Sequence, residues 1–121
     1  MRLADVVTTL GATVICGETL LDREVDCGIA CDLMSDALTY AGPRILFLTG
    51  LTNPQVIRTA ELIDCSAVVF VRGRRPVDAH IRTIAQDKRI PLLTTDYSMY
   101  EACALLHAAG LKGAALRERR A

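Results

Sequence analysis

The sequence has few aromatic residues and no long hydrophobic segment. Aromatic side chains make up 4% of the 121 residues and tryptophan is absent, so the core has to be built from aliphatic side chains. No apolar run approaches the roughly 20 residues that a membrane-spanning helix needs. The opening stretch, Met1–Asp5, contains an acidic residue and lacks the apolar stretch of a secretory signal. We therefore expect a cytoplasmic protein without a membrane segment.

The chain also lacks the net charge that attracts nucleic acid or membranes. Its 14 Lys and Arg residues balance its 14 Asp and Glu residues. The exception is a basic cluster toward the end of the sequence, which suits either a solvated helix end or docking on a partner. This cluster consists of Lys112, Arg117, Arg119 and Arg120. We expect no nucleic-acid and no membrane partner.

The five cysteines lack the spacing of a metal site, because no Cys-x-x-Cys pair occurs. Cys27 and Cys31 fall in a segment that is typical of a strand, where residues four positions apart stand about 13 Å from each other. That distance is too long for two thiolates to share one ion. Cytoplasmic thiols stay reduced, and these side chains behave as small hydrophobic residues. We expect neither a metal nor a cofactor.

Hydrophobic residues make up 51% of the chain, which suits a sheet that is covered on both faces. Three apolar runs each end in a polar turn that opens a helix. They are Ile45–Leu48, Ala67–Val71 and Pro91–Leu93. A repeated strand–turn–helix unit makes successive strands parallel, so their carboxyl ends share one rim, where open α/β sheets bind ligands. The pattern therefore predicts the place of a site more clearly than its ligand.

The spacing of apolar residues predicts alternating helices and strands along the rest of the chain. Helices are expected over residues 2–10, 33–40, 78–88 and 99–109, with one more beginning at Pro54, and strands over 12–16, 25–31, 45–48, 67–71 and 90–93. We therefore expect a single three-layer α/β/α domain with about five mostly parallel strands. Residues 1–24 form its lead-in, 25–111 its core and 112–121 a basic tail. Only the first two strands can break the parallel pattern, because no helix fits between them.

The turn after the first apolar run is the first part of a candidate rim site. Gly50 lets the backbone approach a ligand, and free amides at the following helix start attract an anion. Thr49, Thr52 and Asn53 complete this part. The alternative is a purely structural role for this turn, because Asn53 is a good N-cap before Pro54 at the start of the helix.

The second turn places Arg72, Arg74 and Arg75 around Gly73. Guanidinium groups are fork-shaped donors that suit a phosphate or a carboxylate. The alternatives are a charged solvent-exposed loop and contact with an acidic patch on another subunit.

The third turn and the end of the second strand add hydroxyl and carboxylate groups. Thr95, Asp96 and Ser98 belong to the third turn, and Ser98 also starts a capping box with Glu101. Asp96 has two roles open to it, a ribose hydroxyl or the favoured ion pair with Arg72 or Arg74. Asp32 and Ser35, with Asp36, follow the second strand, and either of the first two can cap a helix there.

Catalytic motifs are missing from the sequence. There is no phosphate-binding loop of the Gly-x-x-x-x-Gly-Lys type, no Gly-x-Gly-x-x-Gly turn and no Gly-x-Ser-x-Gly elbow. The histidines, His80 and His107, fall within predicted helices rather than at strand ends. A binding module is therefore favoured over an enzyme.

Four segments of the chain resemble the DRTGG domain family. They are Ala30–Ser35, Phe47–Gly50, Val69–Gly73 with Pro76, and Ile90–Ser98, and the resemblance extends from about Val25 to Leu111. The family's Asp-Arg is replaced by Leu51-Thr52 and its Thr-Gly-Gly by Arg72-Gly73-Arg74, so Gly50 and Gly73 carry over most clearly.

The resemblance implies an α/β fold similar to the amino-terminal domain of HPr kinase/phosphorylase. Members also occur beside CBS domains and alone in anaerobic bacteria, where they look like accessory proteins of iron-hydrogenase or carbon metabolism. It implies a regulatory or ligand-sensing role and no kinase chemistry. Our leading hypothesis is a non-catalytic module that binds a small anionic ligand, such as a nucleotide, at the rim. The alternative is an assembly protein that acts through a homodimer, a higher homo-oligomer or a protein partner.

Overall fold

The computed structural model describes residues 1–117 and has a three-layer α/β/α architecture, as predicted. Arg119 and Arg120 of the predicted basic tail lie outside the described residues. The helices are α1 (Leu3–Leu10), α2 (Met34–Ala37), α3 (Pro54–Leu62), α4 (Ala79–Asp87) and α5 (Met99–Ala108), with a 3-10 turn η1 (Glu18–Leu20). The strands are β1 (Thr13–Cys16), β2 (Cys27–Ala30), β3 (Tyr40–Ala41), β4 (Ile45–Thr49), β5 (Ala67–Phe70), β6 (Leu92–Thr94), β7 (Lys112–Gly113) and β8 (Ala115–Leu116).

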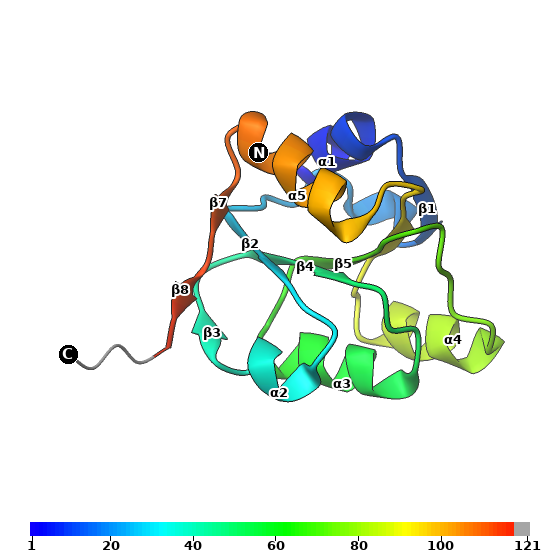
Figure 1. The fold of residues 1–121 in the computed structure, drawn as a ribbon. Coiled ribbons are helices and arrows are strands. Elements are labelled where there is room, and N and C mark those ends of the chain that lie inside the picture. Colours follow the sequence, from blue (N-terminus) through cyan, green and yellow to red (C-terminus); the bar gives the residue numbers. More distant parts are fainter. Residues whose placement is uncertain (118–121) are drawn as a thin grey trace.

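The central sheet has six strands in the order β1-β6-β5-β4-β2-β7. Every neighbouring pair is parallel except β1 and β6, which are antiparallel. The first strand therefore breaks the parallel pattern, as the short β1–β2 connection allows, whereas the second strand follows it. The carboxyl ends of β2, β4, β5 and β6 consequently point to one rim of the sheet (Figure 1).

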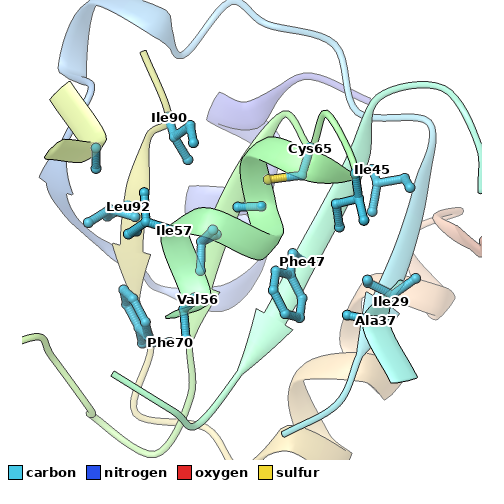
Figure 2. Packing of buried hydrophobic residues seen from close by; sticks show 14 of the residues in the cluster. Ile29, Ala37, Ile45, Phe47, Val56, Ile57, Cys65, Phe70, Ile90 and Leu92 are labelled. Atoms are coloured by element: carbon cyan, nitrogen blue, oxygen red, sulfur yellow. The ribbon is translucent and has the colours of Figure 1, made fainter. Parts of the chain in front are cut away.

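Alternating side chains of the central strands fill two separate cores. Ile45 and Phe47 of β4 point to the side of the sheet that α2, α3 and α4 cover. There they belong to one core with Phe70 of β5 and Ile57 of α3 (Figure 2). Leu46 and Leu48 of the same strand face α1 and α5 on the other side of the sheet. This period of two, with every β4 residue buried, is what a strand covered on both faces requires.

Two helices differ from their predicted form. The helix expected over residues 33–40 is the single turn α2, because Tyr40 instead pairs with Leu116 in the small β3–β8 sheet. The apolar residues of the helix beginning at Pro54 predict that Leu62 is buried with its apolar neighbours, and this prediction is wrong because Leu62 is 64% exposed. At 100° per residue, Val56, Ile57, Ala60 and Ile63 share one side of the helix, whereas Leu62 projects from the opposite side.

The end of the described chain is more ordered than the predicted basic tail. Residues 112–116 form β7 against β2 and β8 against β3. The Arg117 amide then donates to the Thr39 carbonyl at 2.6 Å, and its guanidinium donates to the carbonyls of Leu38 and Tyr40. Lys112 thus belongs to a strand added at the edge of the sheet, and Arg117 holds the following segment against residues 38–40 through its hydrogen bonds. Within residues 1–117, no helix is long and apolar enough to cross a membrane.

Candidate functional site

The polar loops at the carboxyl rim contact each other, as the parallel topology predicts. Asp32, which follows β2, accepts a hydrogen bond of 2.7 Å from the Gly50 amide and one of 3.2 Å from the Thr49 hydroxyl at the end of β4. The Thr49 hydroxyl in turn accepts from the Leu51 amide. Asp32 therefore fixes the shape of the β4–α3 loop and does not cap α2, whose N-cap position is taken by Leu33 without a side-chain hydrogen bond.

The loops after β5 and β6 are joined through the backbone. The Arg72 amide donates to the Tyr97 carbonyl, and the Gly73 amide donates to the Thr95 carbonyl, both at 2.8 Å. Both donors have a left-handed backbone, with φ of 58° at Arg72 and 67° at Gly73. Glycine adopts this conformation readily, whereas a side chain such as that of Arg72 adopts it at a cost of about 1 kcal/mol.

The Arg72 guanidinium lies directly over Gly50. A β-carbon built on Gly50 would stand 3.0 Å from the guanidinium carbon of Arg72 and closer still to one of its nitrogens. A side chain at residue 50 would therefore displace the guanidinium, which is the flexible end of an exposed arginine. This contact brings together two of the predicted binding residues from different loops.

The predicted ion pair of Asp96 with Arg72 or Arg74 is wrong. Four ion pairs occur among residues 1–117, and none includes any of these side chains. The Asp96 carboxylate instead lies beside Gly73, with one oxygen 3.2 Å from where a β-carbon would stand. The left-handed turn at residues 72 and 73 directs the Arg72 side chain toward Gly50 and leaves Asp96 against the backbone. Arg72 and Arg74 are both exposed.

Several predicted site residues have structural roles. Asn53 caps α3 by accepting from the Gln55 amide at 3.0 Å, and Ser98 caps α5 by accepting from the Glu101 amide at 3.2 Å. The Thr95 hydroxyl is buried and donates to the Leu10 carbonyl at 2.7 Å, so it fastens the rim to the end of α1. Ser35 is exposed on α2 and Thr52 is half-buried in the β4–α3 loop.

The rim carries charged side chains of both signs. A hollow of about 420 Å³ beside the third turn is lined by Asp96, Tyr97, Ser98, Glu101 and the end of α1, so its two carboxylates oppose an anion. The arginine side of the rim carries Arg72 over Gly50 and the exposed Arg74, and it is bordered by the carboxylates of Asp32, at the Gly50 amide, and Asp96, beside Gly73. An anionic ligand therefore suits the arginine side of the rim.

Sequence reasoning did not find an apolar groove between α5 and the β2–β7 edge. It has a volume of about 540 Å³. Its floor includes Gly28, Ala30 and Leu48 from the sheet, and its wall comes from α5 and the segment after it. The α5 residues in the wall are Tyr100, Cys103, Ala104, Leu106, His107 and Ala108. A signal was present, because α5 carries apolar residues on nearly all its sides while only one side packs against α1 and the sheet.

The cysteines behave as core residues. All five are free, and Cys16, Cys27 and Cys65 are buried. Burial is the main cause that raises the pKa of Cys65 to about 12, so this thiol stays protonated at neutral pH. No group of three or more His, Cys, Asp or Glu side chains is placed to hold a metal ion within residues 1–117.

Comparison with known proteins places this geometry in a family. The model of the DRTGG domain matches residues 5–109, which is most of the chain. No curated protein matches. A crystal structure of the CBS and DRTGG domains of the regulatory region of Clostridium perfringens pyrophosphatase, complexed with its activator diadenosine tetraphosphate, has a similar fold with a TM-score of 0.64. At 16% identity, the likeness covers 87% of this chain but only 45% of that one.

Proposed function

We propose that this chain, which belongs to the DRTGG domain family, is a regulatory module that binds a small anionic ligand, such as a nucleotide, on the arginine side of the rim. The observation that carries the proposal is the position of Arg72. Its guanidinium lies over Gly50 without a carboxylate at ion-pair distance within residues 1–117. A guanidinium offers paired donors to phosphate oxygens.

The backbone around Arg72 supports this role. The left-handed conformation at residue 72 costs free energy that a glycine would avoid, yet an arginine stands there. Two backbone hydrogen bonds to the β6–α5 loop hold the turn, so the backbone position from which the Arg72 side chain extends is fixed before a ligand arrives. Such preorganisation lowers the entropy cost of binding.

The similar pyrophosphatase region supports a regulatory role of the same class. That region is described as regulatory and was crystallised with a nucleotide activator. Because this chain corresponds to less than half of it, the comparison supports the kind of role and leaves the location of the ligand to the geometry of this chain.

A ligand on Arg72 would act on several loops at once. Arg72 contacts the β4–α3 loop through its side chain and the β6–α5 loop through its backbone, and Asp32 links the β4–α3 loop to β2. Binding that restrains these loops changes the free energy of any assembly that uses the same surface. Regulation would therefore pass through a partner or a second domain that touches the rim.

Isothermal titration calorimetry with ATP and with inorganic tripolyphosphate tests the proposal. We expect binding by the unaltered chain and a loss of affinity of tenfold or more, about 1.4 kcal/mol, in Arg72→Ala. Arg89→Ala is a matched control, because Arg89 is exposed and also has a left-handed backbone, with φ of 56°. It follows α4, close to β6's amino end and away from the rim. Binding that both variants weaken equally, or no binding of either compound, would overturn the proposal.

The second candidate function is assembly through the arginine loop. The observation in its favour is Val77, which is 99% exposed directly after Arg74, Arg75 and Pro76. A fully exposed valine beside two arginines suits a protein contact with an acidic rim. Light scattering distinguishes this candidate, because assembly predicts an oligomer that Arg74→Glu dissociates and nucleotide does not affect.

A further inference from the structure

We infer that the apolar groove beside α5 holds the base of a purine nucleotide whose phosphates lie on Arg72. The inference deepens the proposed function and rests on it. It assigns a ligand class to this groove, which no residue of the predicted site lines.

The groove is open because its floor is made of small residues. The alternation of β2 directs Cys27 and Ile29 into the α2–α3 core and leaves Gly28 and Ala30 on the α5 side. A β-carbon on Gly28 would already reach the Leu111 side chain at 3.4 Å. A volume of about 540 Å³ is within the range of small-molecule sites, which are typically apolar with a few polar groups.

The groove leads to the arginine side of the rim. Its end nearest the rim is formed by Ala30 and Leu48, which stand two residues before Asp32 and Gly50 on their strands. Asp32 accepts from the Gly50 amide, and the Arg72 guanidinium covers Gly50. A flat apolar group in the groove and an anionic group on Arg72 are therefore neighbours, and a nucleotide joins these two chemistries in one molecule.

The groups along the groove fit an aromatic base. Tyr100 is 84% exposed at the start of α5, where its ring offers a face for stacking. Tyr100, Cys103, Ala104 and His107 follow each other at helical spacing, so they form one wall. His107 lies two helical turns after Tyr100 on α5, and Lys112 pairs with Cys27 at the start of β2. Both residues line the groove, so both can donate hydrogen bonds to the polar edge of the base. A two-ring base buries more apolar area in this length than a one-ring base does.

Calorimetry with five probes tests the inference: ATP, GTP, CTP, tripolyphosphate without a base, and adenosine without phosphate. We expect ATP and GTP to bind more tightly than CTP or tripolyphosphate. Ala104→Phe fills the groove from an exposed helix position, and should reduce ATP affinity by tenfold or more while leaving tripolyphosphate affinity unchanged. Ala4→Phe on the exposed side of α1 is the matched control and should change neither.

Tyr100→Ala is a second variant that removes a side chain without filling space. The loss of one stacking face should weaken ATP affinity at least about fivefold and leave tripolyphosphate affinity unchanged.

If ATP and tripolyphosphate bind equally and neither groove variant changes one affinity without the other, the base site is wrong while the rim proposal stands. If adenosine binds and Ala104→Phe abolishes this while Arg72→Ala has no effect, the groove is right and the rim proposal is wrong. If Ala104→Phe instead dissociates a dimer seen by light scattering, a second copy occupies the groove and the inference is overturned.

Discussion

The carboxylate of Asp32 accepts a hydrogen bond of 2.7 Å from the backbone amide of Gly50. The two residues follow neighbouring parallel strands, β2 and β4, so one exposed side chain ties two loops of the rim together. A second bond from the Thr49 hydroxyl strengthens the tie. The rim is therefore a connected structure in which the position of Gly50, and of Arg72 above it, depends on Asp32.

Asp32→Ala should lower the free energy of unfolding by about 1–2 kcal/mol, because a charge-assisted bond to a backbone amide is lost. Urea denaturation followed by circular dichroism measures this change. Asp36→Ala is the control, since Asp36 is an exposed acid of α2 and none of the described hydrogen bonds or ion pairs uses its carboxylate. Equal destabilisation by the two variants would contradict the role given to Asp32.

Gly50→Ala should displace the Arg72 guanidinium with little effect on folding. The new β-carbon meets only the flexible end of the arginine, and φ at Gly50 is not in the left-handed region. We expect ATP affinity to fall as it does in Arg72→Ala. Gln86→Ala is the control, because Gln86 is exposed near the end of α4 and lines neither the rim nor the groove. Calorimetry that finds unchanged ATP affinity in Gly50→Ala would show that the contact does not matter for binding.

Thr95→Val should destabilise the chain by about 1–3 kcal/mol. The substitution keeps the shape of the side chain but removes the buried hydroxyl that bonds the Leu10 carbonyl and accepts from the Tyr97 amide. Thr83→Val provides the comparison, because the Thr83 hydroxyl makes an exposed bond of 3.4 Å within α4. Denaturant midpoints that shift by similar amounts in both variants would argue against the importance of the Leu10 bond.

Stability should fall at alkaline pH through Cys65. Its pKa is raised from an ordinary value of 9.0 to about 12 in the folded chain, mainly by burial. Between these values the unfolded chain releases the proton and the folded chain keeps it. The free energy of unfolding therefore decreases as pH rises above about 9, by up to about 1.4 kcal/mol per pH unit. Below that pH the contribution of this thiol is constant.

Urea denaturation of the unaltered chain and of Cys65→Ala at pH 8 and pH 10.5 checks this expectation. Other thiols titrate in both proteins, so the informative quantity is the difference between their two slopes. The variant should lose less stability than the unaltered chain over this interval. Identical slopes would mean that the Cys65 thiol ionises as easily in the folded as in the unfolded state.

The central part of the fold was predictable because its strands are unambiguous. β4 and β5 consist almost entirely of large apolar residues, and Asn53 with Pro54 marks the start of α3 from local chemistry alone. β7 was not predictable, since Lys112 and Gly113 have no strand preference and pair only because β2 has an open edge beside them. The same holds for β3, whose partner β8 is far away in the sequence.

The meeting of the polar loops followed from topology, whereas their individual roles did not. Parallel strands bring Asp32, Gly50 and Arg72 to one rim whatever the details of packing. The bond from Thr95 to Leu10 spans 85 positions of the chain, so no local pattern reveals that this hydroxyl is occupied. The groove beside α5 depends on where that helix lies over the sheet, which small residues such as Ala30 permit but do not specify.

The left-handed backbone at Arg72 affects how the chain would respond to laboratory evolution. Arg72→Gly relieves about 1 kcal/mol of backbone cost, so a screen that rewards only heat resistance would enrich the glycine. The same screen with nucleotide present would retain the arginine if the bound state contributes more than that. The residue found at position 72 after each screen would thus show whether nucleotide binding through Arg72 stabilises the protein by more than the backbone conformation costs.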